Sequence, residues 1–285
     1  AMLALLENQQ ASTQLRMLAL GNLNTASAID YALSSDLIDL RVTAAGMLIE
    51  SDPVQATRIL GEQLASYGST QQAQSALASL AQIASPEADK LIEDFAKGME
   101  SGDVPAELRL DVLEAAAKRG FRDVVSAFDS KRDSSDPIGA FVECLEGGDV
   151  RSGEKIVNTH LGAQCIRCHR VSSASGSKIG PNLKNIGRKE RSYLLRSLVD
   201  PGADIAKGFG MVSVSLHDGS TVSGLVGSET GDTLEILSLD GSTKLIDKGK
   251  IASRTAAMST MPPVGLILTK RELRDVIAFL SGLDE

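Results

Sequence analysis

Two cysteines and a histidine lie close together near the middle of the chain, in the run Cys165-Ile166-Arg167-Cys168-His169. The spacing is C-x-x-C-H, which is typical of the attachment site of a c-type haem. Two thiols three positions apart can add to the two vinyl groups of one porphyrin, and the adjacent histidine can bind the iron as an axial ligand. The motif therefore predicts one covalent haem c, held by Cys165 and Cys168 with His169 on the iron.

Three other uses of the motif stay open at the level of sequence. A zinc site needs four ligands, but outside the motif the chain has only Cys144, His160 and His217, none of them paired. A thioredoxin-like dithiol requires a βαβ context, which the sequence lacks. A structural disulfide between such close cysteines is strained and leaves the histidine unexplained. Haem attachment accounts for all three side chains, so we favour it.

Length and composition describe a globular protein. The chain has 285 residues, 42% of them hydrophobic, and a mean hydropathy near zero. This length is enough for two domains with cores of their own. No apolar run approaches the ~20 residues of a membrane-spanning helix. Because haem c is attached outside the cytoplasm, the motif predicts a periplasmic or otherwise extracytoplasmic location.

Several smaller features narrow the function. The start Ala1-Met2 is typical of a cloning junction, so we expect a fragment of a longer protein. Aromatic residues make up 3% of the chain and tryptophan is absent, which argues against a surface that stacks on sugars or bases. An isoelectric point of about 5.1 argues against nucleic-acid binding. We expect the remaining cysteine, Cys144, to be a small buried residue, with a disulfide-linked dimer as the alternative.

Charge is unevenly distributed along the chain. Residues 1–135 hold 11 basic and 19 acidic side chains, whereas the remaining residues hold 18 of each. Residues 151–196 hold ten basic side chains against two acidic ones. These ten, here called the basic collar, are Arg151, Lys155, Arg167, Arg170, Lys178, Lys184, Arg188, Lys189, Arg191 and Arg196. Beside a redox centre they could steer an acidic partner and neutralise haem propionates; the alternative is a solvated face without a partner.

Residues 1–135 show helical periodicity only. A Leu-Arg pair followed by an alanine-rich apolar stripe recurs at 15–20, 40–48 and 108–116. The pattern is similar to HEAT repeats, whose paired helices stack into an α-solenoid; an ordinary helical bundle is the alternative. We expect this domain to be a scaffold or a docking surface, because its sequence suggests no chemistry.

Residues 136–285 form the predicted second domain, after a linker at 134–137. Asp149 is the expected N-cap of its first helix, and further helices are expected over 189–198 and 269–283. Residues 209–252 change to the period of two that is typical of strands. They are broken by Asp218-Gly219 and similar turns, and predict four or five short antiparallel strands in a small sheet or barrel, inserted at about 206–254. A loop is expected over 258–263.

Together these motifs resemble the haem-binding C-terminal domains of planctomycete and verrucomicrobial proteins. The resemblance covers about residues 145–283 and rests on the order Gly147-Gly148-Asp149, Gly153, C-x-x-C-H, Gly180-Pro181-Asn182-Leu183, Asp200-Pro201, Asp218-Gly219, Met261-Pro262 and residues 275–280. In that family a class I cytochrome c core is interrupted by a β insert ahead of a distal methionine. Helical repeats often precede it, and a propeller-type dehydrogenase domain, which this sequence lacks, is commonly fused to it.

The resemblance implies a mainly α fold, in which a HEAT-like solenoid precedes a cytochrome c-like helical domain with a small antiparallel insert. One departure from the family is Val157, where cytochromes usually carry an aromatic residue at the crossing of the first and last helices. A smaller side chain there should loosen the crossing unless a neighbour fills the space.

The resemblance also implies roles for single residues. The Pro181 carbonyl should accept the second ring N–H of His169, which orients the imidazole. Met261 is the implied distal ligand, and a neutral thioether raises the reduction potential. The alternatives are Met258, His160, His217 or an open site. The candidates for the apolar wall are Tyr193, Leu194, Leu198 and Phe279.

The function that follows is a mono-haem cytochrome module, which carries single electrons from a fused or partner dehydrogenase to a downstream acceptor. Whether it belongs to a larger dehydrogenase stays open, and an electron-transfer module is favoured over an enzyme. The alternative is a haem peroxidase or a gas or redox sensor with an open or displaceable distal ligand, because the distal loop holds two methionines. In a third hypothesis the helical repeats bind a protein partner as the main function.

Overall fold

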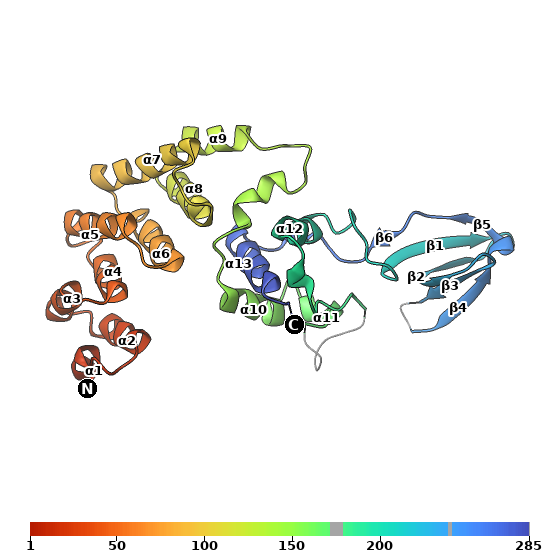
Figure 1. Ribbon diagram of the computed structural model, residues 1–285, viewed down its shortest axis with the longest axis horizontal. Coiled ribbons are helices and arrows are strands. Elements are labelled where there is room, and N and C mark those ends of the chain that lie inside the picture. The colour runs from red at the N-terminus through yellow and green to blue at the C-terminus, as the bar shows by residue number, and fades with distance from the viewer. Residues whose placement is uncertain (172–178, 239–240, 285) are drawn as a thin grey trace. The chain divides into compact units, whose positions relative to one another are not determined.

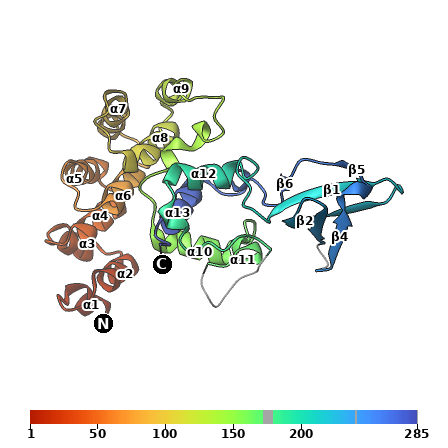
Figure 2. The ribbon, with the colours of Figure 1, turned by 45° about the vertical axis from the view of Figure 1, so that its right-hand side comes forward.

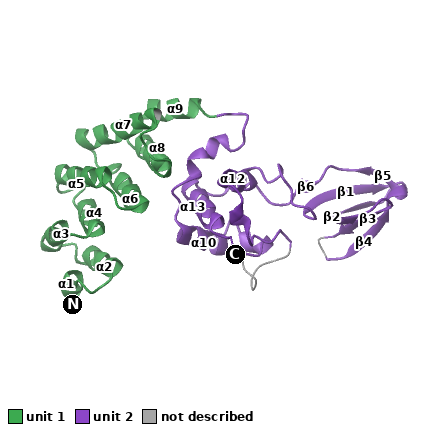
Figure 3. Cartoon of the chain, viewed as in Figure 1, with its two compact units in different colours: residues 1–132 green, residues 133–285 purple. Residues whose placement is uncertain are grey.

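A computed structural model describes residues 1–171, 179–238 and 241–284. Within these residues the chain is mainly helical and carries a small antiparallel sheet (Figure 1). It divides into two compact units, Ala1–Arg132 and Asp133–Glu285 (Figure 3). We call these unit 1 and unit 2. No helix of the described residues combines the length and the apolar character that crossing a membrane requires.

Unit 1 consists of helices joined by short turns. Its helices are α1 (Met2–Glu7), α2 (Thr13–Leu23), α3 (Ala26–Leu33), α4 (Ile38–Met47), α5 (Pro53–Ala65), α6 (Thr70–Leu80), α7 (Pro86–Ser101), the 3-10 helix η1 (Ala106–Leu108), α8 (Arg109–Lys118) and α9 (Arg122–Ser130). Two of these helices begin at a capping residue followed by proline. Asp52 caps α5 and Ser85 caps α7, and each helix has proline in its first turn.

The helices of unit 1 pack in a regular order. Each of α1 to α8 contacts a neighbour in sequence, α2, α4, α6 and α8 contact one another in succession, and α5, α7 and α9 do the same. Their apolar stripes form two cores, one around Leu20 and Leu40 and the other around Leu60, Leu77 and Leu108.

Unit 2 has a helical part built around two crossing helices. Its helices are η2 (Gly139–Cys144), α10 (Val150–Thr159), α11 (Cys165–Cys168), η3 (Ile186–Arg188), α12 (Arg191–Val199), η5 (Val264–Leu266) and α13 (Lys270–Ser281). Asp149 caps α10 as predicted, since its side chain accepts the Ser152 N–H at 2.7 Å. Thr269 and Glu272 form a capping box at the start of α13.

The crossing of α10 and α13 depends on a glycine. The two helices lie side by side (Figure 2). A Cβ on Gly153 would fall 2.6 Å from the carbonyl carbon of Asp275 and 2.8 Å from Cβ of Phe279. Val157, next on the same face of α10, is only 1% exposed. Cβ of Phe279 on α13 also lies at this crossing, and the Phe279 side chain is buried in the core of unit 2.

The sheet of unit 2 lies between α12 and η5 in sequence. Its strands are β1 (Gly210–Leu216), β2 (Thr221–Glu229), β3 (Thr233–Leu237), β4 (Thr243–Asp247), β5 (Ile251–Arg254) and β6 (Met258–Ser259). All pairings are antiparallel, in the order β4-β3-β2-β1-β5, and β6 also pairs with β1. One face carries a small core with Val212, Val214, Leu234 and Ile236.

A loop was predicted over 258–263, but its first two residues form the strand β6. Met258 and Ser259 pair with Met211 and Gly210 and extend the sheet beyond the expected end near residue 254. Two residues are too few to show a period of two, so this strand has no signature in the sequence. One of the similar turns expected between the strands is Asp240-Gly241, and Asp240 lies outside the described residues. In the Asp218-Gly219 turn, Gly219 adopts the left-handed conformation that such turns favour, with φ of 85°.

Candidate functional site

The C-x-x-C-H motif lies on the wall of a cavity of about 240 Å³ in unit 2. Most of the lining is apolar and comes from several stretches of chain between Val157 and Leu280. The lining includes Val157, Cys165, Cys168, His169, Pro181, Leu183, Ile186, Tyr193, Leu194, Leu198, Pro201, Asp204, Ile205, Phe209, Ser259, Met261, Val264, Val276 and Leu280. Segments separated by more than a hundred residues therefore meet around one space that can hold an apolar group.

The two cysteines share one face of a single helical turn. Gln164 adopts a left-handed backbone conformation with φ of 45°, and α11 begins directly after it. Residues three apart on a helix are neighbours, and both thiols border the cavity. Burial, with a smaller contribution from Cys168, raises the pKa of the Cys165 thiol. Reactive dithiols instead have a lowered thiol pKa, so this environment argues against the thioredoxin-like alternative.

A backbone contact orients the imidazole ring of His169. Nδ1 lies 2.9 Å from the carbonyl oxygen of Pro181. A carbonyl oxygen can only accept, so Nδ1 carries the hydrogen and donates it. In the neutral ring Nε2 then keeps its lone pair, which is the form that binds a metal ion. This is the hydrogen bond that the family resemblance implied.

Gly180 allows the chain to approach that ring. A Cβ at this position would lie 3.0 Å from Nδ1 and from Cε1 of His169, and 3.0 Å from the Cys168 carbonyl oxygen. The Gly180 N–H donates to the same Cys168 oxygen at 2.7 Å. The Gly-Pro turn is thereby tied to the motif, and this explains why glycine precedes Pro181.

Of the two candidate distal methionines, the structure brings one to the cavity. Met261 is half-buried, borders the cavity and packs on the core of unit 2. Its N–H donates to Oγ of Ser259 at 3.2 Å, so β6 helps to place it. Met258 is 61% exposed and is not part of the lining. The geometry therefore favours Met261 over Met258 as a residue that could face His169 across the cavity.

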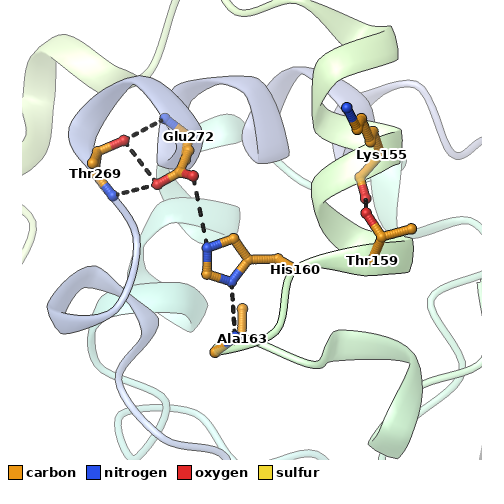
Figure 4. Close-up of polar contacts among 7 residues, drawn as sticks. Lys155, Thr159, His160, Ala163, Thr269 and Glu272 are labelled. Atoms are coloured by element: carbon orange, nitrogen blue, oxygen red, sulfur yellow. Dashed lines mark hydrogen bonds and ion pairs between the residues drawn. The ribbon is translucent and has the colours of Figure 1, made fainter.

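Neither alternative histidine borders this cavity. In His160, Nδ1 accepts the N–H groups of Gly162 and Ala163 at 3.2 and 3.0 Å, and Nε2 lies 3.6 Å from Oε1 of Glu272 (Figure 4). His217 follows β1, and its N–H donates to the carbonyl oxygen of Lys250. Sequence alone could not separate these histidines from the site, since their partners lie far away along the chain or are backbone atoms.

Three of the four predicted wall residues border the cavity, namely Tyr193, Leu194 and Leu198. Phe279 does not; it is buried in the core of unit 2 instead. Sequence analysis missed Asp204, whose carboxylate accepts the Tyr193 hydroxyl at 3.1 Å. Burial and this hydrogen bond raise the pKa of Tyr193, which keeps the phenol neutral. In the sequence, Asp200-Pro201 predicts only a turn, and nothing there predicts that the residues after it line the cavity.

The structure leaves fewer residues of the basic collar exposed than the ten that were counted in the sequence. Arg191 pairs with Glu146 at 2.6 Å and Arg196 with Asp136 at 2.7 Å, so two collar cations stabilise unit 2 itself. Lys178 lies outside the described residues. The exposed members are Arg151, Lys155, Arg167, Lys184, Arg188 and Lys189. The partners Glu146 and Asp136 lie before residue 151, outside the segment over which the charges were counted. The count therefore overestimated the number of unpaired cations in the collar.

The structure gives no ligand set for the zinc alternative. In the described part of the chain, no three His, Cys, Asp or Glu side chains gather as ligands for a metal ion. Cys144 is fully buried in the core of unit 2, as expected for a small apolar residue.

The cavity offers a different set of groups. It brings together two thiols, an oriented imidazole, a thioether and an apolar wall. This donor set fits a covalently attached haem.

Comparison with known proteins adds no relative: no protein-family model matches the chain, and no curated protein matches it.

Proposed function

We propose that unit 2 is a c-type cytochrome module that carries single electrons between redox proteins. The observation that carries this proposal is the common cavity of Cys165, Cys168, His169 and Met261, in which Nδ1 of His169 is already committed to the Pro181 carbonyl. A dithiol site or a structural disulfide would need neither the oriented imidazole nor the surrounding apolar wall.

Each residue has a definite part in this proposal. When bound, the haem would supply an iron that exchanges one electron between its ferric and ferrous states. Cys165 and Cys168 would hold it through thioether bonds, His169 would bind the iron through Nε2, and Met261 would bind it through its thioether sulfur. The apolar lining would exclude water. A filled sixth position would keep oxygen and peroxide away, which separates a carrier from a peroxidase or a gas sensor.

The arrangement of elements supports a class I cytochrome c-like fold for unit 2. In this proposal α10 and α13 are the first and last helices, which cross at Gly153. The sheet is the β insert that precedes Met261. The successive contacts among alternate helices of unit 1 support a HEAT-like solenoid that would dock a partner.

Location and partners follow from the same chemistry. Covalent haem attachment would place the protein in the periplasm or another extracytoplasmic space. The donor would be a dehydrogenase, fused or separate, and the acceptor a downstream redox protein. The exposed members of the basic collar, which include Arg167 within the motif itself, support a partner with an acidic face.

Covalent attachment is the direct test of this proposal. The chain is produced in a host with haem c maturation, denatured, and its haem content and mass are measured. We expect one haem per chain that survives denaturation, and a large loss of covalent haem in Cys165→Ala and Cys168→Ala. The matched control is Cys144→Ala, which should keep one haem. A wild-type chain that releases all its haem on denaturation, or takes up none, would contradict the proposal.

A further inference from the structure

His160 occupies the junction between α10 and the loop that enters the C-x-x-C-H motif. It is the C-cap residue of α10, and only four residues separate it from Cys165. Its ring accepts two backbone N–H groups of that loop at Nδ1, from Gly162 at 3.2 Å and Ala163 at 3.0 Å. Because Nδ1 accepts, the neutral ring carries its hydrogen on Nε2, and that atom faces Glu272 at 3.6 Å.

Glu272 is itself held at the start of α13. Its Oε2 accepts the N–H and the hydroxyl of Thr269, each at 2.9 Å, in the capping box (Figure 4). The Thr269 N–H contributes most to lowering the pKa of Glu272, and His160 adds a smaller electrostatic contribution. The carboxylate is therefore ionised at neutral pH, and its second oxygen, Oε1, is the one directed at His160.

A second contact joins the same two segments. A Cβ on Gly162 would lie 3.0 Å from Cγ2 of Ile267, so the loop before Cys165 lies against the segment between Met261 and α13. His160 borders no part of the cavity in the described residues, and both of its ring nitrogens face protein groups. Its contacts thus join two segments, the loop before Cys165 and the segment between Met261 and α13.

From these contacts we infer that His160 is a positioning residue that couples the haem-attachment loop to the segment carrying Met261. One side of the ring fixes the turn before Cys165, and the other holds the first turn of α13. The inference rests on the proposed function. Loss of the link should loosen the segment that carries Met261, so that Met261 would leave the proposed iron more often.

The two halves of this link can be separated by substitution in the full chain. In His160→Asn, Oδ1 can still accept N–H groups two and three residues ahead, as Asn does in turns, but the side chain is too short to reach Glu272. In Glu272→Gln the amide oxygen can still accept from Thr269, while the negative charge is removed. Thr159→Ala is the matched control, since the Thr159 hydroxyl donates only to the Lys155 carbonyl oxygen of its own helix (Figure 4).

The measurement is the rate of carbon monoxide binding to the reduced haem protein, because a firmly held methionine resists displacement. We expect His160→Asn and Glu272→Gln each to raise this rate about fivefold, which is the scale of a partly exposed ionic contact. The double variant should match the single ones, because all remove the same contact. Thr159→Ala should bind at the wild-type rate. Melting temperatures without carbon monoxide check that each variant stays folded.

Three outcomes would overturn the inference. If His160→Asn binds at the wild-type rate while His160→Ala is faster, then His160 supports only its own turn. If all variants bind at the wild-type rate on a normally loaded protein, no coupling exists and the proposed function still stands. If wild-type protein attaches no haem, both the proposed function and this inference fail.

Discussion

The imidazole of His169 is held by this chain's own backbone. Pro181 accepts its Nδ1 hydrogen at 2.9 Å, and Gly180 leaves room for the ring. The sequence predicted the three motif residues from their spacing alone and Pro181 from a family resemblance. It could not predict the role of Gly180, because only the folded chain shows which atoms a Cβ would meet.

Gly180→Ala should disturb this arrangement. Its Cβ would lie 3.0 Å from two ring atoms of His169, so the ring or the turn must shift. Overpacking of this kind costs about 1–3 kcal/mol, and we expect a lower melting temperature together with less attached haem. Gly202→Ala is the matched control, since its Cβ would have only the Asp200 carboxylate near, at 3.9 Å. Equal melting temperatures and haem contents in the two variants would contradict this reading of Gly180.

At the scale of elements, the crossing of α10 and α13 sets the position of the motif. α10 leads into the loop before Cys165, and α13 contributes Val276 and Leu280 to the cavity. Gly153 allows close contact, since the Asp275 carbonyl group and Cβ of Phe279 on α13 lie where its own Cβ would be.

Gly153→Ala should therefore separate the two helices. The new methyl group would meet the Asp275 carbonyl and Cβ of Phe279, neither of which can move without its helix. We expect a loss of about 2–4 kcal/mol in the unfolding free energy of unit 2, measured by denaturant titration. Gly21→Ala in α2 has nothing within 4 Å of its Cβ and should leave that transition in place. An unchanged transition in Gly153→Ala would show that the crossing is not tightly packed.

Elements with strong local signals were predicted well, and those that depend on distant partners were not. Asp149 was predicted as a cap because Ser, Thr, Asn and Asp serve this role wherever a helix begins. The strands β1, β2 and β3 were predicted from alternation and turns, within an expected total of four or five. β6 escaped because it has two residues and pairs with Gly210 and Met211, nearly fifty positions earlier. The link between His160 and Glu272 was missed for the same reason, since it joins residues from opposite ends of unit 2.

At the scale of the whole molecule, the two parts of the chain differ in net charge. The acidic excess lies in residues 1–135, while residues 136–285 are balanced overall and carry the basic collar. In our proposal the first part docks a partner and the second exchanges electrons. The pairing of Arg191 and Arg196 within unit 2 reduces the collar to fewer exposed cations than the sequence suggested.

If the collar steers an acidic partner, electron transfer should depend on salt. We expect the rate with an acidic redox protein to fall steeply as ionic strength rises, because screening shortens the range of exposed charges. Lys184→Glu should lower the rate at low salt several-fold and weaken its salt dependence. Lys244→Glu on β4 makes the same charge change at an exposed position of unit 2 outside the collar and should alter the rate less. A rate that does not respond to salt would remove steering from the account.

The most direct test of the central claim is the ferric and ferrous absorption spectrum of the matured protein and of its two methionine variants. Ligation by His169 and Met261 predicts a low-spin spectrum with a ferric charge-transfer band from the methionine sulfur. Met261→Ala should lose that band and become high-spin, whereas Met258→Ala should keep it. A high-spin wild-type spectrum, or loss of the band in Met258→Ala alone, would contradict the account.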